Sequence, residues 1–300
     1  MRRLSIDGVK YILSKLTIMQ KVILFYKFVP ISDPTTVMYW QRALCEKLGI
    51  KGRILISSHG INGTLGGDIK QLKYYTRDMK SHPLFEGIMY KWSDGTGGDF
   101  PKLRVKVKDE IVAFNAREEI KVTDKGIVNG GKHLKPAAVN KLVEERGDDV
   151  IFYDGRNMYE AQIGRFKNTI IPNVKTSRDF KKDIEEGEIS KYKDRPIVTY
   201  CTGGIRCEIL SAMMINRGYE EVYQIDGGIV KYGEHSKDEG LWEGKLFVFD
   251  DRMQVGFSDN AKDIAECETC GVRTSRQVNS TNIRRKLTVR CEECDKVTVE

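Results

Sequence analysis

Residues 197–214 contain two apolar runs on either side of a short glycine-containing loop, and few folds accommodate this pattern. The run 197–200 is rich in β-branched residues and predicts a buried strand, whereas the run that follows Glu208 predicts a buried helix. A strand, a glycine-rich loop and a helix direct backbone N–H groups and a helix N-terminus toward one point. Cys201 occupies that point, and Arg206 adds a fixed positive charge on the same loop. These surroundings favour the thiolate, the reactive form of cysteine.

The loop thiol has two interpretations. In the first, Cys201 and Arg206 are catalytic, and the surrounding backbone holds an anionic persulfide or sulfenate on the sulfur; this cradle consists of Thr202, Gly203, Gly204 and Ile205. In the second, Cys201 is a buried structural cysteine at a glycine-rich turn. We favour the first, because the two glycines and Arg206 have no other evident purpose there. Cys207, at the start of the helix, is either a resolving thiol or a residue that packs behind the loop.

Cysteine content and charge indicate the compartment in which the chain works. Four of its seven cysteines lie in two C-x-x-C pairs, which indicates a reducing compartment and a metal site rather than a disulfide scaffold. No apolar run reaches the roughly 18 residues that span a membrane, and residues 1–20 lack the features of a signal peptide. We therefore expect a cytoplasmic protein with no membrane partner. The net charge of +7 permits a polyanionic partner without requiring one.

The two C-x-x-C pairs have the spacing of a four-cysteine metal site. Twenty residues separate Cys270 from Cys291, and the complete set is Cys267, Cys270, Cys291 and Cys294. This spacing predicts a structural Zn²⁺ site in which the protein supplies all four ligands, so that no coordination position remains for catalysis. The alternatives are redox-active thiols and thiols without a metal.

The order of predicted elements places the chain in the α/β class with three folded parts. Residues 20–115 alternate as β-α-β-β-α-β, which predicts a ferredoxin-like α+β domain. Residues 133–245 alternate strands with helices, which predicts a parallel sheet with Asp154, Arg156 and Cys201 at the carboxyl ends of its strands. Residues 1–19 are an N-terminal extension, either a docked helix or loosely ordered. Residues 116–132 are polar and predict a linker, and residues 246–300 form a zinc-ribbon-like tail.

A run of alternating basic residues lies near the end of the first domain. Because strand side chains alternate between faces, one face should carry Lys102, Arg104, Lys106 and Lys108. Such a row is either a phosphate track for a nucleic acid or a solvated sheet face. Arg284 and Arg285 belong to a second basic group in the C-terminal tail, and the two groups are candidate RNA-binding residues.

The motifs after residue 150 together resemble the rhodanese domain. They comprise residues 154–160, residues 164–172, the Cys-x4-Arg loop from Cys201 to Arg206, and Asp226-Gly227-Gly228. The resemblance implies that Cys201 carries a persulfide and that Asp154 and Arg156 brace the loop. It also implies that the central parallel sheet is a rhodanese domain.

Across residues 20–295 the chain resembles the oxygen-dependent tRNA uridine-34 hydroxylase family, through stretches that include residues 25–28, 60–65, 103–106, 200–208 and 247–250. The resemblance implies an acylphosphatase-like N-terminal domain, tRNA as partner, molecular oxygen as co-substrate and 5-hydroxyuridine as product. The Cys-x4-Arg loop alone equally supports a sulfurtransferase that passes persulfide sulfur from Cys201 to a thiol, and a non-catalytic binding module is the third hypothesis. The sequence contains no evident organic cofactor site and no signal for an oligomeric state.

Overall fold

The N-terminal domain is a five-stranded sheet covered on one face by two helices. The computed structural model describes residues 19–279 and 287–297, so the predicted extension lies almost entirely outside the described residues. The strands are β1 (Gln20–Phe28), β2 (Lys51–Ser57), β3 (Gly60–Asp68), β4 (Met89–Asp94) and β5 (Leu103–Val107), in the order β4-β1-β3-β2-β5. Only the β2–β5 pair within this sheet is parallel. The predicted ferredoxin-like domain is confirmed, with β5 added at one edge.

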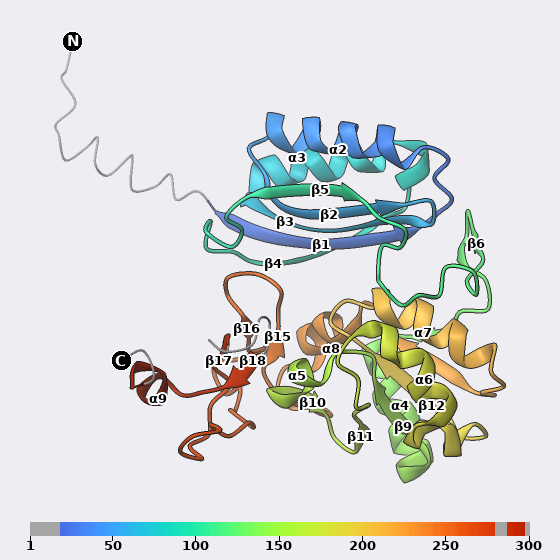
Figure 1. Ribbon diagram of the computed structural model, residues 1–300, viewed down its shortest axis with the longest axis vertical. Coiled ribbons are helices and arrows are strands. Elements are labelled where there is room, and N and C mark those ends of the chain that lie inside the picture. Colours follow the sequence, from blue (N-terminus) through green and yellow to red (C-terminus); the bar gives the residue numbers. More distant parts are fainter. Residues whose placement is uncertain (1–18, 280–286, 298–300) are drawn as a thin grey trace.

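The two helices pack on one side of this sheet because apolar side chains alternate along its strands. Ile23 and Phe25 of β1 are buried against α2 (Pro34–Lys47) and α3 (Ile69–Lys80). The carboxylate of Asp33 caps α2 by accepting from two backbone N–H groups. A single turn of 3₁₀-helix, η1 (Pro83–Phe85), leads into β4. The other face of the sheet is turned toward the second domain (Figure 1).

The segment between the two domains is more ordered than its polar composition suggests. It forms a small hairpin of β6 (Val122–Thr123) and β7 (Gly126–Ile127), followed by β8 (Lys132–Leu134). Ala116 and Ile120, in the predicted linker 116–132, are buried in the core of the second domain. β8 pairs in parallel with β13 and completes the sheet of that domain. A few apolar residues in a polar stretch therefore anchor this segment.

The second domain contains the predicted parallel sheet, with strand order β11-β9-β12-β13-β8. Its strands besides β8 are β9 (Ile151–Asp154), β11 (Thr169–Ile170), β12 (Ile197–Tyr200) and β13 (Val222–Ile225). Its α-helices are α4 (Pro136–Arg146), α5 (Met158–Gln162), α6 (Phe180–Glu186), α7 (Ile205–Ile215) and α8 (Gly228–Ser236), and its 3₁₀-helices are η2 (Gly147–Asp149), η3 (Ser177–Asp179) and η4 (Glu188–Tyr192). Side chains of α6 and α7 share one apolar core, and those of α4 and α8 share another. The sheet is thus covered on both faces, as parallel sheets require.

The C-terminal part consists of short strand pairs beside the second domain (Figure 1). β10 (Gly164–Phe166) pairs with β14 (Trp242–Gly244), β15 (Leu246–Phe247) with β16 (Gln254–Val255), and β17 (Gln277–Asn279) with β18 (Leu287–Val289). The last element is α9 (Glu292–Lys296). A small core of Ile163, Phe247, Ala265 and Val289 joins this part to the second domain. No helix in the described residues combines the length and apolarity that crossing a bilayer demands.

Candidate active site at the domain interface

Cys201 lies at the carboxyl end of β12 and is fully buried. The backbone N–H of Gly204 donates a hydrogen bond to its Sγ atom over 3.1 Å. Burial alone would raise the pKa of Cys201, but the hydrogen bond from the Cys207 thiol, the charge of Arg206 and the backbone N–H groups of both residues lower it to about 5. The loop thus stabilises a thiolate at neutral pH, as its sequence predicts. Cys207 itself is buried, and burial together with Cys201 raises the pKa of its thiol.

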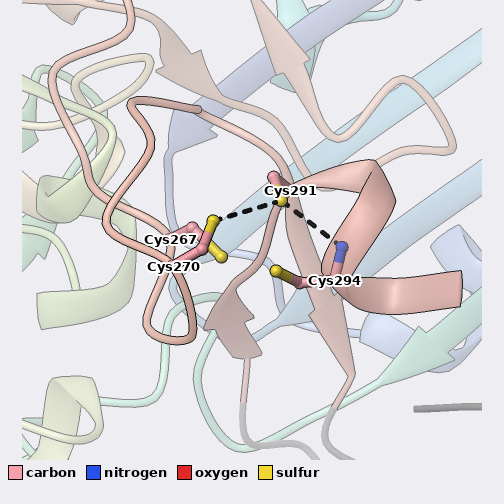
Figure 2. A group of neighbouring side chains, drawn as sticks. All are labelled: Cys267, Cys270, Cys291 and Cys294. Atoms are coloured by element: carbon pink, nitrogen blue, oxygen red, sulfur yellow. Dashed lines mark hydrogen bonds between the residues drawn. The ribbon is translucent and has the colours of Figure 1, made fainter. Parts of the chain in front are cut away.

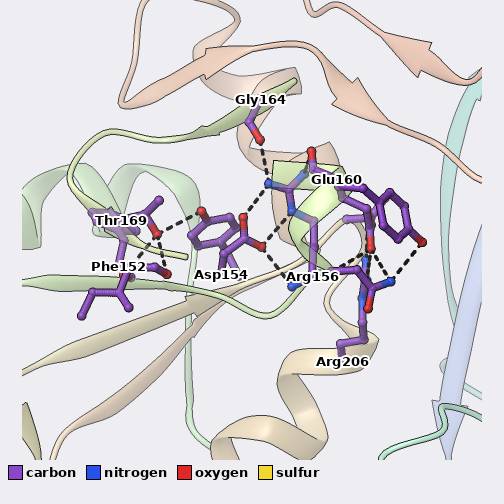
Figure 3. Close-up of polar contacts among 12 residues, drawn as sticks. Phe152, Asp154, Arg156, Glu160, Gly164, Thr169 and Arg206 are labelled. Atoms are coloured by element: carbon purple, nitrogen blue, oxygen red, sulfur yellow. Dashed lines mark hydrogen bonds and ion pairs between the residues drawn. The ribbon is translucent and has the colours of Figure 1, made fainter. Parts of the chain in front are cut away.

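Arg206 is fixed by a buried carboxylate. Its Nη1 and Nη2 atoms lie 2.6 Å and 2.9 Å from the two carboxylate oxygens of Glu160 (Figure 3). Nη2 also donates to the Thr202 hydroxyl at 3.1 Å. Glu160 belongs to a capping box with Asn157 at the start of α5, which orients its carboxylate. Arg206 therefore contributes its charge to the loop while its donors are largely occupied within the protein.

Asp154 and Arg156 form a second buried ion pair beside the loop. Arg156 donates from Nε and Nη2 to the two oxygens of Asp154, at 2.9 Å and 2.6 Å, and from Nη2 to the Gly164 carbonyl oxygen (Figure 3). Both side chains are completely buried. Between them, the Gly155 N–H donates to the carbonyl oxygen of Tyr200, the residue before the cysteine. This hydrogen bond holds the end of β9 against the end of β12.

A glycine closes the loop from the side of α8. The N–H groups of Ile229 and Val230 donate to the carbonyl oxygens of Cys201 and Thr202. Gly228 has a φ of +67°, and a Cβ atom at this position would lie 2.5 Å from the Cys201 carbonyl oxygen. Only glycine fits both the backbone conformation and the space. The Asp226-Gly227-Gly228 motif thus packs the start of α8 against the cysteine loop.

The N-terminal domain covers the cysteine loop. Leu24 and Tyr26 of β1 lie against its glycines: a Cβ atom on Gly203 would meet Leu24 at 2.4 Å, and one on Gly204 would meet the Tyr26 hydroxyl at 2.9 Å. The Tyr26 hydroxyl donates to Glu208 on α7 at 3.0 Å. Burial, followed by the charge of Glu208, raises the pKa of Tyr26 well above its ordinary value. The two domains therefore share one site.

A pocket of about 910 Å³ opens between the domains, and Tyr26, Glu208 and Gly227 are among the residues that line it. Glu208 in its wall accepts hydrogen bonds from Tyr26 and Gln224, and its carboxylate lies 3.4 Å from Nε2 of His133. The hydrogen bond to Glu208 raises the pKa of His133. Lys91 of β4 and Asp226 at the end of β13 line the same pocket.

Sequence reasoning did not identify Tyr26, Lys91, Glu160 and Glu208 as site residues, and it assigned His133 no special role. Contact between separate domains leaves no local pattern in a sequence. No sequence motif therefore marked Tyr26 and Lys91 as site residues. Glu160 had one, because Asn157 and Glu160 have the spacing of a capping box.

Basic residues in and beside β5 are exposed, and those of the strand itself, Arg104 and Lys106, lie on the sheet face that turns away from the helices. Lys102, Arg104, Lys106 and Lys108 are all exposed, and β5 is an edge strand. Strand register aligns Arg104 with Arg53, Thr64, Leu24 and Lys91 in one row across the sheet. Burial, and then the charge of Arg104, lowers the pKa of Arg53. The basic edge and the cysteine loop therefore adjoin the same sheet face. Arg284 and Arg285 lie outside the described residues.

The four C-terminal cysteines converge to form a possible metal site (Figure 2). The Sγ atoms of Cys267, Cys270, Cys291 and Cys294 all lie within 4.8 Å of one another. Cys270 and Cys291 have a sulfur–sulfur distance of 3.7 Å. Metal–sulfur bonds of about 2.3 Å in a tetrahedron place the sulfurs roughly 3.8 Å apart, so this donor set fits a metal ion. The cluster joins the turn after residue 266 to the start of α9.

Comparison with known proteins agrees with this arrangement. Residues 20–111 match the family described as "UPF0176 acylphosphatase like domain", residues 135–235 match "Rhodanese-like domain", and residues 243–300 match "Rhodanase C-terminal". Fold and site together define a rhodanese-domain protein whose cysteine loop is covered by an acylphosphatase-like domain.

Relatives of similar length extend the match to nearly the whole chain. The tRNA uridine(34) hydroxylase of Corynebacterium urealyticum is 57% identical over 275 residues, covering 91% of this chain and 93% of the relative. The tRNA uridine(34) hydroxylase of an Arthrobacter species is 56% identical over 280 residues, covering 92% and 94%. The chain belongs to the tRNA uridine(34) hydroxylase family, as the resemblance in its sequence predicted.

Proposed function

We propose that this chain hydroxylates the uridine at position 34 of tRNA to 5-hydroxyuridine, with molecular oxygen as co-substrate. The observation that carries the proposal is a cysteine buried where the two domains meet, with the Gly204 N–H donating to its sulfur and Leu24 and Tyr26 of the other domain lying against its loop. The relatives that bear the name of this activity share more than half of their residues with the chain along almost their full length. The cytoplasm, where tRNA is found and thiols stay reduced, is the proposed location.

Cys201 is the proposed reactive group, and its neighbours determine its charge state. The N–H of Gly204 and the guanidinium of Arg206 stabilise negative charge on the sulfur. The Arg206–Glu160 and Arg156–Asp154 pairs keep the loop rigid, because each is desolvated and hydrogen-bonded on several sides. The loop therefore holds its thiolate in one fixed geometry.

The basic edge of the N-terminal sheet is the proposed tRNA contact. Lys102, Arg104, Lys106 and Lys108 would bind phosphates, together with Arg53 in the same row as Arg104. Four inter-strand steps of roughly 4.8 Å separate Arg104 from Lys91, so about 19 Å lies between the basic edge and the pocket. An anticodon loop bound at the edge can therefore extend a base toward the cysteine loop. We also propose Arg284 and Arg285 as tRNA contacts.

The C-terminal cysteine cluster is a proposed structural zinc site. A set of four thiolates is typical of Zn²⁺, and it leaves no position for a substrate. The metal would hold the turn at Cys267 against α9, and the proposed boundaries of this part are residues 246–300, after a rhodanese domain of 133–245 and an N-terminal domain of 20–115. Metal analysis should find one zinc per chain, and Cys294→Ser should abolish this binding. A full equivalent of zinc in that variant would contradict the assignment.

Mass spectrometry of tRNA tests the reaction itself. Cells that lack the gene should contain tRNA without 5-hydroxyuridine at position 34; the wild-type gene should restore it, and Cys201→Ser should not. Normal 5-hydroxyuridine in the deletion strain would refute the proposal. Sulfur transfer from thiosulfate to cyanide by the purified protein, with no effect on tRNA, would instead establish the sulfurtransferase that the Cys-x4-Arg loop also allows.

A further inference from the structure

Lys91 is the only buried lysine in the part of the chain that the structure describes, with 8% of its surface exposed. Its side chain extends from β4 toward the second domain, past the glycines of two loops. A Cβ atom on Gly203 would lie 3.9 Å from its Cδ atom, and one on Gly227 would lie 3.3 Å from its Cε atom. The lysine therefore reaches the point where the cysteine loop meets the Asp226-Gly227-Gly228 loop.

The ammonium group of Lys91 has no anionic partner among the described residues. No carboxylate oxygen of that part of the chain lies within 4.0 Å of its Nζ atom. The ammonium group lies over the ring of Tyr26, with its Nζ atom 4.8 Å from the ring centroid. Burial lowers the pKa of Lys91, whereas Cys201, Asp226 and Glu208 raise it. A desolvated cation with unused donors is costly unless a ligand supplies the acceptor.

Asp226 provides an acceptor in the wall of the same pocket. It follows β13, its backbone is held by a hydrogen bond to Leu134, and 55% of its side chain is exposed. Its carboxylate contacts His133 only at 3.9 Å, so most of its capacity to accept hydrogen bonds is unused. By contrast, Glu208 in the same wall already receives hydrogen bonds from Tyr26 and Gln224. Lys91 and Asp226 thus place an unused donor and an unused acceptor in the wall of one pocket.

We propose that Lys91 and Asp226 read the Watson–Crick edge of a uracil base, with the Lys91 ammonium donating to O4 and the Asp226 carboxylate accepting from N3–H. The inference rests on the proposed function and names the residues that determine its base specificity. Uracil presents an acceptor beside a donor on this edge, whereas cytosine presents an amino donor at C4 and an acceptor at N3. Cytosine would place its amino donor against the Lys91 donor and its N3 acceptor against the Asp226 acceptor. No bond forms or breaks in this recognition, and no proton is transferred.

The alignment of residues across the N-terminal sheet supports a base-reading role for Lys91. Lys91 lies on the same sheet face as Arg53 and Arg104, in one line across the strands. A phosphate backbone that follows the basic edge therefore approaches the pocket along the face from which Lys91 projects. Lys231 on α8 lines the pocket as well, but it is half-exposed and paired with Glu234 at 2.5 Å, so it has no comparable unused donor.

Binding of two anticodon stem-loop RNAs, which differ only in U or C at position 34, tests the inference. Fluorescence anisotropy should show about tenfold tighter binding of the U34 RNA to the wild-type protein. Lys91→Met and Asp226→Asn should each reduce this preference to less than threefold, mainly by weakening binding of the U34 RNA. The control Lys231→Met should keep the wild-type preference. A wild-type protein without preference, a Lys91→Met variant that retains it, or an equal loss of affinity for both RNAs would overturn the inference.

The same preparations separate this inference from the proposed reaction. A Lys91-dependent preference for U34 in a protein that forms no 5-hydroxyuridine would support base reading and refute the hydroxylase activity. Formation of 5-hydroxyuridine by a wild-type protein whose Lys91→Met variant keeps the U34 preference would support the activity and refute base reading.

Discussion

Replacing Glu160 by glutamine should destabilise the second domain strongly. Glu160 is fully buried, and its two oxygens accept from Arg206 at 2.6 Å and 2.9 Å, while the arginine side chain is only 9% exposed. Removing one charge of a buried pair costs about 3–5 kcal/mol, because the remaining charge stays desolvated. Glutamine keeps one acceptor, so the lower end, about 3 kcal/mol, applies. At roughly 4 °C per kcal/mol for a domain of this size, the Tm should fall by about 12 °C.

Thermal unfolding followed by circular dichroism measures this change, and an exposed pair provides the control. Glu234→Gln removes the partner of Lys231, and both side chains of that pair are more than 40% exposed. It should shift the Tm by less than about 4 °C, since exposed pairs contribute under about 1 kcal/mol. A Glu160→Gln variant whose Tm falls no further than that of the control would refute the reasoning.

Three other variants test the remaining features of the site. The thiolate absorbance attributable to Cys201, taken as wild type minus Cys201→Ser, should be present at neutral pH and disappear as the pH falls through about 5, because the pKa of this thiol is lowered; a midpoint near 9 would contradict the loop chemistry. Gly228→Ala should lower the Tm more than Gly218→Ala, since both have positive φ but only the Gly228 position is crowded; equal losses would exclude the close approach. Arg104→Ala should weaken tRNA binding and reduce the salt dependence of log Kd by about one; an unchanged slope would remove Arg104 from the tRNA contact.

The sequence was sufficient to predict the structural features that local patterns determine. The loop from Cys201 to Arg206 and the spacing of the four C-terminal cysteines each lie in short segments whose conformation follows from glycine positions and ligand geometry. The alternation of strands and helices likewise predicted both sheets. These features depend on neighbours in the chain, which the sequence shows directly.

Features that depend on distant contacts could not be predicted. β8 has only three residues, two of them charged or polar, and it is a strand because β13 offers an open edge. Tyr26 and Lys91 resemble ordinary residues of strands, and their roles arise only when the N-terminal sheet packs on the cysteine loop. The polar segment 116–132 concealed buried residues, because a few apolar side chains are enough to fix a chain to a neighbouring core.

The contact between Leu24 and Gly203 bears on how a thiol with a lowered pKa avoids oxidation in the cell. A thiolate with so low a pKa would be modified before it met a tRNA if peroxides or other small electrophiles could reach it. Because the covering strand belongs to a different domain, access to the sulfur depends on how tightly the two domains pack, whereas the groups that lower its pKa lie in the loop itself. Substitutions that loosen β1 should therefore increase susceptibility to oxidation, and they should also lower the pKa of Cys201, because burial raises that pKa. The donors that stabilise the thiolate and the strand that covers it are thus encoded in separate parts of the chain.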